Sequence, residues 1–386
     1  MNQWPIVKLG DVCTVAGGGT PKTAVSEYWG GPIPWLTPKD LSGNRNLYIS
    51  HGERSITQSG LANSSATLLP KGTVLWSSRA PIGHVAIAET TVATNQGFKS
   101  FIPGPNVDSA YLAYILIFMK DQLQEIGTGA TFKEVSAKRA KSIQIPLPPF
   151  EEQRRIAQVL TQTSLNISNT KQQIDLLDTI CRTPIFANPS RPSTELKEYI
   201  RTISTGKSVK DTSDPDSGNK ILKISAVTSG FFKGNETKYL PVEYSPKESH
   251  AVTYGDLLVS RANTSEMIGA SALVDQDESN VYLPDKLWKI FPAGDVPKEA
   301  IWHLLQLPTI RKRMSQVATG SSGSMKNISQ RSFLKVEVPN LTLSEISSIT
   351  EVVKRILSTR KLLLKKLTLL EELHQSLATR AFAGQL

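Results

Sequence analysis

The chain has 386 residues, of which 39% are hydrophobic and 20% are charged. This composition excludes general disorder, and the length predicts two or three domains. The formal net charge of +10 favours a polyanionic partner such as nucleic acid, the alternative being a basic surface with no such partner. The two cysteines, Cys13 and Cys181, stand far apart in no metal-ligand spacing, which argues against a disulfide framework and a zinc site.

Two further patterns bear on location. The N-terminus shows no charged segment followed by an apolar core, so no signal peptide is predicted. No stretch of about 18 apolar residues occurs, so no membrane span is predicted. We therefore expect a cytoplasmic protein with no membrane partner.

The first half begins with short β-prone runs separated by glycine-containing turns. Such runs lie at residues 72–76, 85–88 and 143–145, and one helix is predicted at residues 109–126. A proline-rich joint at residues 146–149 follows, and from Glu151 a long helix is predicted that ends before Pro184. Its apolar residues fall three or four apart and include Ile156, Leu160, Ile167, Ile174 and Leu177.

The second half has the same order of elements. Residues 221–224 and 256–259 are β-prone, and residues 298–317 predict a helix. The last predicted helix carries an apolar repeat every seven residues, at Ile349, Ile356, Leu363, Leu370 and Leu377. A second, alternate position of the repeat is filled by Ile346, Val353 and Leu367 and is interrupted by Arg360 and His374. Such a repeat is typical of a coiled coil. The fold class is α/β, with mixed, strand-rich modules each followed by a long helix.

The two halves also resemble each other residue by residue. GTGATFKEVS at residues 127–136 aligns without gaps with GSSGSMKNIS at residues 320–329, which pairs Gly127 with Gly320 and Lys133 with Lys326. Further pairs are Ser136 with Ser329, Pro146 with Pro339, Arg79 with Arg261, residues 98–99 with residues 288–289, and residues 9–19 with residues 196–206. The paired positions lie about 190 residues apart, and a repeat of that length indicates a duplicated module with its helix.

Each long helix has one apolar stripe, and the simplest way to bury both stripes is against each other. The second module must fold back between the helices, so we expect antiparallel pairing that holds the modules at opposite ends of a rod. The alternative is that each helix packs on its own module.

Signatures of catalysis are absent from the sequence. Residues 147–150 (LPPF) lack the Asn or Asp that an adenine-holding motif needs first, and residues 206–208 (GKS) lack the earlier P-loop glycine. Pro284-Asp285 is not followed by a suitably spaced nuclease motif, and the five histidines stand singly. We therefore predict no catalytic, cofactor-binding or metal-binding residue in this chain.

A basic, duplicated chain without catalytic motifs is more typical of a binding protein. Phosphate contacts need Lys, Arg and small hydroxyl or backbone donors, and base reading needs Arg, Lys, Asn or Gln. The candidates for contacting DNA are Lys22, Thr37, Lys39, Arg45, Arg79, Asn95, Gln96, Thr128, Lys133, Lys207, Arg261, Asn263, Lys286, Ser322 and Lys326. Two features recur in both halves, the strand-end arginine and the Gly-rich loop before a lysine. The arginines also fit a structural pairing with a carboxylate.

Four segments together resemble the specificity subunits of type I restriction–modification systems, the HsdS family. They are residues 33–41 (IPWLTPKDL), 78–83 (SRAPIG), 94–98 (TNQGF) and 145–153 (IPLPPFEEQ). The second half departs from the pattern, because residues 340–345 (NLTLSE) replace the proline joint and lack the Glu-Gln pair.

The resemblance implies two target recognition domains at residues 1–148 and 188–342, followed by conserved helices at residues 149–187 and 343–386. It implies that the chain reads a bipartite, gapped site in double-stranded DNA. It further implies that two methylation subunits use S-adenosylmethionine and that restriction subunits use ATP and Mg²⁺. The alternatives are a stand-alone DNA-modifying enzyme and a coiled-coil interaction protein that does not bind DNA.

Overall fold

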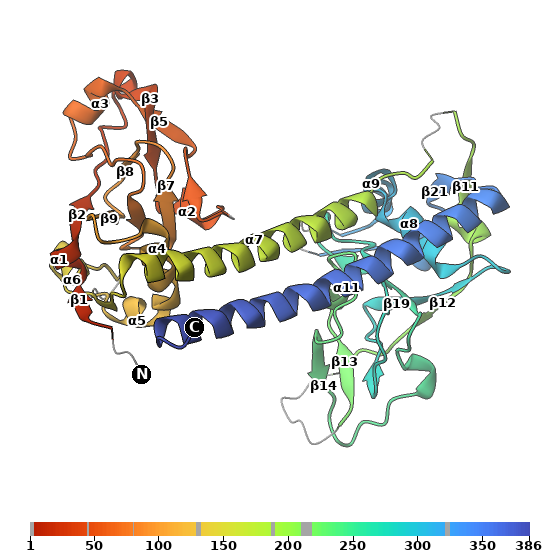
Figure 1. The fold of residues 1–386 in the computed structure, drawn as a ribbon. Coiled ribbons are helices and arrows are strands. Elements are labelled where there is room, and N and C mark those ends of the chain that lie inside the picture. Colours follow the sequence, from red (N-terminus) through yellow and green to blue (C-terminus); the bar gives the residue numbers. More distant parts are fainter. Residues whose placement is uncertain are drawn as a thin grey trace. The chain divides into compact units, whose positions relative to one another are not determined.

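The computed structural model describes residues 4–44, 46–79, 81–128, 133–186, 190–209, 218–320 and 325–386. The chain forms two compact units (Figure 1). The first unit consists of Met1–Gln172 and Leu364–Leu386, and the second consists of Gln173–Leu363. Each unit therefore contains a strand-rich module and one part of each long helix. The four-part division at residues 148, 187 and 342 stays a prediction.

The module of the first unit is built mainly of short strands. Its elements are β1 Ile6–Lys8, α1 Leu9–Val12, β2 Cys13–Gly17, η1 Ser26–Tyr28, β3 Trp29–Leu36, α2 Pro38–Ser42, β4 Tyr48–Ile49, β5 Arg54–Ile56, α3 Gln58–Ala62, β6 Val74–Trp76, β7 Val85–Ala88, β8 Ala93–Thr94, β9 Lys99–Pro103, α4 Ser109–Phe118, α5 Lys120–Glu125, α6 Ala137–Lys141 and β10 Gln144–Pro146. A five-stranded sheet has the order β2-β9-β6-β7-β4, a three-stranded sheet the order β5-β3-β8, and β1 pairs with β10.

The second unit has a comparable module. Its elements are β11 Ser193–Glu195, η2 Leu196–Glu198, β12 Ile200–Thr205, β13 Lys220–Leu222, η4 Ile224–Ala226, β14 Thr237–Tyr239, η5 Glu248–His250, β15 Leu257–Ser260, β16 Ala262–Asn263, β17 Ser271–Leu273, β18 Val281–Tyr282, β19 Leu287–Pro292, α8 Lys298–Gln306, α9 Pro308–Val317, β20 Lys326–Asn327, α10 Gln330–Leu334 and β21 Glu337–Pro339. The main sheet has the order β12-β19-β15-β17, beside β14-β13-β18, β16-β20 and β11-β21.

Both predicted module helices exist, but each is interrupted. The helix predicted at residues 109–126 breaks at Met119 into α4 and α5, and the one predicted at residues 298–317 breaks at Leu307 into α8 and α9. Pro308 explains the second break, because proline lacks the amide hydrogen of a helix interior and disfavours helical geometry in the residue before it. All six residues from Tyr111 to Leu116 are buried, so α4 is a core helix.

The strand ladders test the internal repeat independently of the alignment. Val74 lies opposite Phe101 and Ser77 opposite Phe98, just as Leu257 lies opposite Ile290 and Ser260 opposite Leu287. The closing strands repeat too: Leu9 N donates to Ile143 O at 2.8 Å, and Leu196 N donates to Val336 O at 3.0 Å. The duplication is therefore present in the hydrogen-bonding frame of both modules.

The backbone hydrogen bonds shared by the two modules correct three of the residue pairs predicted from the sequence repeat. Ser78 is equivalent to Arg261, because Val135 N donates to Ser78 O and Ile328 N donates to Arg261 O, both at 2.9 Å. Arg79 is therefore equivalent to Ala262, and the prediction of a shared strand-end arginine is wrong. Phe98 is equivalent to Leu287 and not to Trp288, a shift of one residue.

The third correction concerns the Gly-rich loops. Thr128 pairs with Glu134 and Thr319 pairs with Asn327 through two backbone hydrogen bonds each, at 2.8–3.0 Å. The loop closed by Thr319 and Asn327 is two residues longer, so the gapless pairing of Gly127 with Gly320 is wrong. The later equivalences hold, and the hydroxyls of Ser136 and Ser329 each cap the next helix by accepting from the backbone three residues on.

One tryptophan of the core lies on different strands of equivalent pairs in the two modules. The pairs Val74–Phe101 and Ser77–Phe98 set a register in which Lys99 falls opposite Trp76, and the equivalent pair in the second ladder is Trp288 opposite Val259. Trp76, Val259 and Trp288 are at most 1% exposed. Each module therefore accommodates one tryptophan at this place in its core, on opposite strands of the pair.

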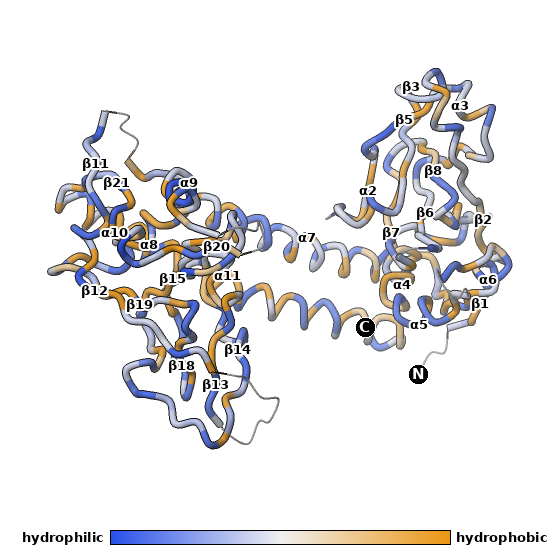
Figure 2. The backbone as a smooth tube through the Cα atoms, turned by 180° about the vertical axis from the view of Figure 1, so that it is seen from behind, coloured by the Kyte–Doolittle hydropathy of each residue, from blue (hydrophilic) through white to orange (hydrophobic). Residues whose placement is uncertain are grey.

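The two long helices are α7 Phe150–Ile180 and α11 Leu343–Phe382, and hydrophilic and hydrophobic residues alternate along both (Figure 2). In the first unit they are antiparallel, because Arg155 binds the backbone of Leu386, Thr163 contacts His374 and Lys171 pairs with Glu371. The predicted antiparallel pairing is therefore confirmed within this unit.

The predicted seam residues take part in this packing to different extents. In the first unit, Ile156 and Leu160 are fully buried with Ala378 and Ala381, and Leu377 packs partly against them. In the second unit, Ile349 and Ile356 are buried in the module core, and Leu177 packs against it. Ile174 is also buried, whereas Ile167, Leu363 and Leu370 are half-buried. The alternative that each helix packs only on the module before it is wrong, since α11 contributes to both cores.

Candidate nucleic-acid interface

Four of the predicted DNA-contacting residues meet at one hollow of the first unit. Thr37, Lys39, Arg79 and Asn95, with Pro38, Gly97 and Glu134, line a space of about 460 Å³ that we call the Arg79 hollow. Its walls come from the segment before α2, the end of β6, the turn before β9 and the end of the Gly-rich loop. Residues scattered along more than 90 positions of sequence are thus brought to one surface.

The Glu134 carboxylate in the lining of the hollow lies beside two cations. Glu134 lies 3.7 Å from Arg79 Nη1 and 3.2 Å from Lys99 Nζ. The Lys99 side chain is 13% exposed, whereas that of Arg79 is 35% exposed. Lys99 is therefore the more buried partner of Glu134, and Arg79 remains partly open to solvent. The structural pairing considered for Arg79 is present, and it leaves the guanidinium accessible.

The neutral side chains of the hollow form hydrogen bonds within their own turns. The Thr37 hydroxyl donates to Asp40 at 2.6 Å as part of a capping box at the start of α2. Asn95 Oδ1 accepts from Gly97 N at 2.8 Å, so the acceptor of this side chain is used within the turn. A Cβ at Gly18 would lie 2.0 Å from Asn95 O, so only glycine allows this turn to pack on β2.

The other candidates of the first unit lie outside the hollow. Lys22, Gln96, Thr128 and Lys133 are exposed, and Gln96 bonds to Thr20. Lys39, which lines the hollow, pairs with Glu53 at 3.0 Å, and this hydrogen bond raises the pKa of the exposed Lys39 ammonium. Arg45 lies outside the described residues, as does Ser322 of the second unit.

The candidates of the second unit also converge. Asn263 lies opposite Lys326 in the β16–β20 ladder, and Arg261 N donates to Lys286 O at 3.0 Å. We call Arg261, Asn263, Lys286 and Lys326 the Arg261 cluster. Lys207 follows the end of β12 and lies 6.0 Å from the ring of Tyr244. The Arg261 cluster occupies the place in the module frame that the Arg79 hollow occupies in the first.

Two members of the Arg261 cluster have buried donors without a hydrogen-bond partner in the described structure. They are Arg261 Nε and Asn263 Nδ2. Asn263 Oδ1 accepts from Thr264 N at 2.9 Å, so its acceptor is used and its donor is free. Unpaired buried donors are costly, and they are common where a ligand supplies the missing acceptor.

Sequence reasoning missed Glu134 and Lys99 at the Arg79 hollow, and one further cation of the first unit. Glu134 and Lys99 were not selected, because neither an acid nor a mid-strand lysine fits the simple pattern of a DNA-contacting loop. Arg54 was also missed; its guanidinium stacks 3.4 Å from the ring centre of Trp29 and lies 5.7 Å from that of Trp35. The ladder places Trp35 opposite Arg54, a pairing that no local sequence signal predicts.

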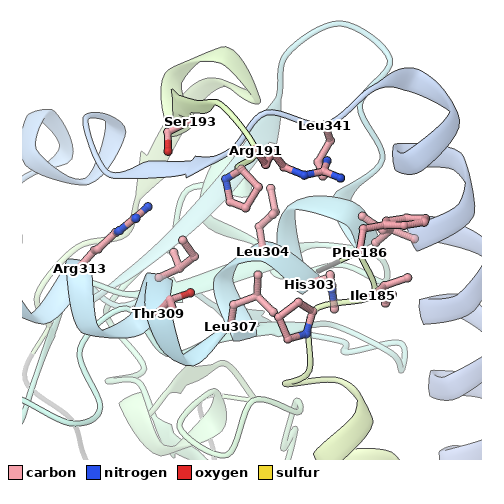
Figure 3. A pocket seen from close by; sticks show the side chains of 14 residues that line it. Ile185, Phe186, Arg191, Ser193, His303, Leu304, Leu307, Thr309, Arg313 and Leu341 are labelled. Atoms are coloured by element: carbon pink, nitrogen blue, oxygen red, sulfur yellow. The ribbon is translucent and has the colours of Figure 1, made fainter. Parts of the chain in front are cut away.

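A different kind of hollow lies in the second unit, between the segment after α7 and helices α8 and α9 (Figure 3). Its volume is about 420 Å³, and its lining is mainly apolar, with Phe186, Leu304 and Leu307. His303 is 2% exposed, and its burial lowers the pKa of the imidazole. A neutral imidazole in an apolar wall is a poor receptor for DNA, so we do not assign this hollow to the interface.

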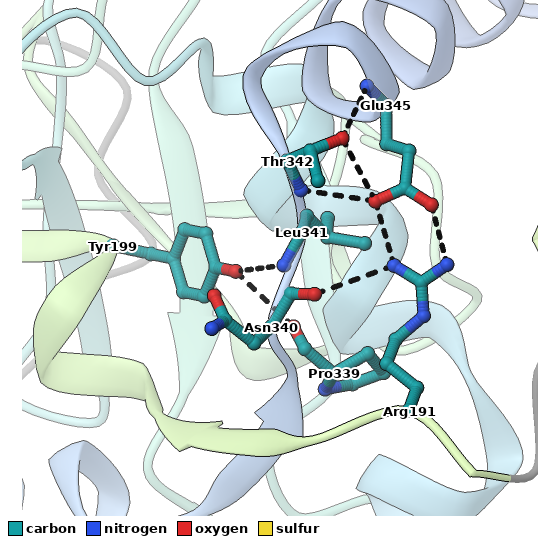
Figure 4. Close-up of polar contacts among 7 residues, drawn as sticks. All are labelled: Arg191, Tyr199, Pro339, Asn340, Leu341, Thr342 and Glu345. Carbon is teal, nitrogen blue, oxygen red and sulfur yellow. Dashed lines mark hydrogen bonds and ion pairs between the residues drawn. The ribbon is translucent and has the colours of Figure 1, made fainter.

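A polar network fixes one wall of that hollow and the start of α11 (Figure 4). Arg191 binds both carboxylate oxygens of Glu345, and Thr342 N donates to Glu345 at 2.9 Å. The hydrogen bonds from Arg191 and Thr342 lower the pKa of Glu345 to about 2. Tyr199 joins the same segment by donating to Pro339 O at 3.1 Å and accepting from Leu341 N at 2.8 Å.

The corresponding joint of the first unit uses different residues. Gln153 is 1% exposed, and its Nε2 donates to Asn106 O and to Pro148 O, each at 2.9 Å. Its Oε1 accepts from Asp108 N at 2.9 Å. The departure of residues 340–345 from the first-half pattern is therefore compensated by the Arg191–Glu345 pair.

Cys13 and Cys181 are buried free thiols, and burial raises their pKa to about 11 and about 12. Within the described ranges, no three His, Cys, Asp or Glu side chains come together as a metal site. No described helix combines the length and the apolar character needed to cross a bilayer.

Comparisons with known proteins give a consistent result. A family model described as the type I restriction modification DNA specificity domain matches residues 1–179. The type I restriction enzyme MjaIX specificity subunit of Methanocaldococcus jannaschii is 46% identical over 180 residues, which are 46% of this chain and 42% of that relative. The MjaVIII specificity subunit of the same organism is 24% identical over 377 residues, which are 92% of this chain and 86% of the relative.

Solved structures share the fold along nearly the whole chain. A crystal structure of the type I restriction-modification S subunit from M. genitalium matches 98% of this chain and 96% of its own, with a TM-score of 0.61 at 12% identity. A chain from a structure concerned with assembly and conformational transition of the type I R-M system matches 100% and 99%, with a TM-score of 0.55 at 16% identity.

Proposed function

We propose that this chain, whose residues 1–179 match the type I restriction modification DNA specificity domain, is a specificity subunit of that kind and reads a bipartite, gapped site in double-stranded DNA. One half of the site is read by the Arg79 hollow and its surroundings, and the other by the Arg261 cluster. Catalysis belongs to partner subunits in this proposal. The chain itself contributes recognition, and the cytoplasmic location remains a prediction.

The proposal of two half-sites rests on one observation. The two modules share a hydrogen-bonded frame, and at the same place in that frame they present different polar residues. The first presents Arg79 beside Asn95, and the second presents Arg261 beside Asn263 and Lys286. Arginine, lysine and asparagine are the side chains that read base edges, so two different sets on one frame support two different half-sites.

DNA binding needs cations that are free to contact the nucleic acid, and in the first unit Arg79 is such a cation. Glu134 accepts from Lys99 and holds Arg79 loosely at 3.7 Å. An exposed pair of this kind contributes only about 0–1 kcal/mol, so Arg79 can leave Glu134 for a base or a phosphate at little cost. Lys99 still compensates the Glu134 charge when Arg79 moves.

The long helices provide a surface for the partners. Leucines on α7 and α11 stay exposed after each unit has packed: Leu165, Leu369 and Leu373 in the first unit, and Leu176 and Leu362 in the second. Their exposed fractions range from 48% to 69%. Apolar side chains in this number are typical of a surface covered in an assembly. We assign them to two methylation subunits that use S-adenosylmethionine, with restriction subunits that use ATP and Mg²⁺ joining the complex.

The test is to express the chain with its methylation partner and to map methylated adenines across a genome. The expected result is one motif in two parts separated by a constant gap. A contiguous motif, or methylation without a motif, refutes bipartite reading. Methylation by the purified chain alone, with S-adenosylmethionine, favours the stand-alone enzyme, whereas absence of DNA binding even at low salt favours the coiled-coil interaction protein.

A substitution assigns the half-sites to the units. Arg79→Ala removes one reading side chain, and a lost bidentate contact relaxes discrimination by about 1–3 kcal/mol at one base pair. We expect the motif to lose information in one half only, with the other half and the gap unchanged. Lys71→Ala, which removes an exposed cation away from the hollow, is the matched control and leaves the motif intact.

A further inference from the structure

A small cavity in the second unit lies apart from the Arg261 cluster. It has a volume of about 260 Å³ and is formed by the segment after α7, the turn after η4, the loop before β17, the end of α8 and the start of α9. This volume is below the roughly 300–1,000 Å³ of pockets for drug-sized ligands, and so it suits a small ion or a single group of a larger molecule.

Two arginines face this cavity, and neither forms an ion pair within the described ranges. Arg182 Nη2 donates to Ser229 O at 3.0 Å, and Arg311 Nη2 donates to Glu266 O at 3.0 Å. Both partners are backbone carbonyls, which compensate the charge of a guanidinium poorly. The side chain of Glu266 lines the cavity but is exposed.

Arg311 also has an N–H donor for which the described residues offer no hydrogen-bond acceptor. Its Nη1 is buried and has no hydrogen-bond partner among the described residues. Burial, and then the neighbouring charge of Arg182, lower the pKa of Arg311 to about 10. A buried cation beside a second cation is unfavourable unless an anion lies between them. The arrangement is therefore incomplete in the free chain.

We propose that this cavity binds a phosphate group between the guanidinium groups of Arg182 and Arg311. A guanidinium offers its N–H groups as a planar fork, and one carboxylate satisfies one fork. Two forks call for an anion with more than two acceptor oxygens, which a phosphate provides. The nearby hydroxyls are already committed, because Thr228 donates to Ser225 O at 3.2 Å and Ser229 donates to Phe231 O at 3.0 Å.

The cavity shares two elements with the Arg261 cluster. Glu266 follows Asn263 in the same loop, and Lys326 Nζ donates to Ser315 O in α9, one turn after Arg311. The phosphate group can therefore come from the backbone of bound DNA or from free phosphate. The chemistry of recognition is the same in both cases, and binding measurements separate the two sources.

The first measurement is calorimetric titration of the full chain with orthophosphate, against chloride buffer of equal ionic strength. We expect saturable binding that weakens at least tenfold in both Arg182→Met and Arg311→Met. The control is Lys312→Met, which removes an exposed cation from the same helix and leaves binding unchanged. Two variants are used because Arg311 is more buried than Arg182. If Arg311→Met does not fold, the phosphate affinity of Arg182→Met tests the proposal by itself.

The second measurement is fluorescence anisotropy of a labelled duplex of arbitrary sequence. If the cavity takes a DNA phosphate, Arg182→Met weakens duplex binding about tenfold and orthophosphate competes with the duplex. If it takes free phosphate, the duplex binds equally well to wild type and variant, while the calorimetric loss remains. The proposal is overturned if neither ligand distinguishes Arg182→Met and Arg311→Met from Lys312→Met. Mapping of the methylation motif does not depend on this result, so the two proposals fail separately.

Discussion

Gln153 allows a sharp test of how the first module is joined to α7. Its side-chain amide makes three hydrogen bonds, two to the carbonyls of Asn106 and Pro148 and one from the amide of Asp108, all at 2.9 Å. Asp108 in turn caps α4 by accepting from Tyr111 N at 2.8 Å. The substitution Gln153→Met keeps the volume of the side chain and removes all three hydrogen bonds.

The magnitude follows from the contacts. A typical intramolecular hydrogen bond contributes about 0.5–1.5 kcal/mol net, so three bonds amount to about 1.5–4.5 kcal/mol. Gln153 is 1% exposed, and water therefore cannot replace the lost partners without rearrangement. We expect Gln153→Met to lower the free energy of unfolding of the first unit by about 3 kcal/mol.

Hydrogen exchange at the first turn of α4 is the suitable assay, because it reports on the first unit independently of the second. Gln172→Ala, at an exposed position of the same helix, is the control and leaves the exchange rates unchanged. A loss below about 0.5 kcal/mol in Gln153→Met would show that these hydrogen bonds do not stabilise the joint.

Two predictions concern pH. Glu345 has its pKa lowered by Arg191 to about 2, so its stabilising contribution is full above the unfolded pKa and is lost as the pH falls from about 4.5 towards 2. Glu345→Gln should therefore lower the melting temperature at pH 7 and flatten the acid limb below pH 4; an unchanged acid limb contradicts this. Burial lowers the pKa of His374, so stability is full above about pH 6.5 and decreases as the pH falls below it. His374→Gln should reduce that decrease between pH 7.5 and 5, as measured by thermal melts, and an identical decrease refutes the assignment.

The sequence predicted the positions of helices and strands better than it predicted which residues of the two modules are equivalent. Glycine turns and β-prone runs located strands such as β7, whose bounds agree with residues 85–88. The heptad pattern located α11, because a long amphipathic helix carries its own periodic signal. The break at Met119 was missed because apolar residues continue across it, whereas Pro308 was a sequence signal for the break at Leu307 that the apolar pattern outweighed.

The residue types that form the candidate site could be predicted from the sequence. The contacts between those residues were harder to predict. Arg79 and Asn95 were selected because base reading uses such side chains on loops, and the structure brings them together. Their partner Glu134 was missed, because an ion pair between residues 55 positions apart depends on tertiary packing. The pairing of Arg79 with Arg261 was wrong for a similar reason: both follow a serine, but only the ladder register shows which serine is equivalent.

The exchanged tryptophans have a consequence for how the modules can be recombined. Trp76 faces Lys99 in the first module, whereas Trp288 faces Val259 in the second. A chimera that takes β6 from the first module and β19 from the second brings two tryptophans together in a space built for one. The reverse chimera, with β15 and β9, places valine opposite lysine and leaves a void in the core, and both defects are costly in a close-packed interior. New specificities are therefore expected to arise by transfer of whole modules, with both strands inherited together.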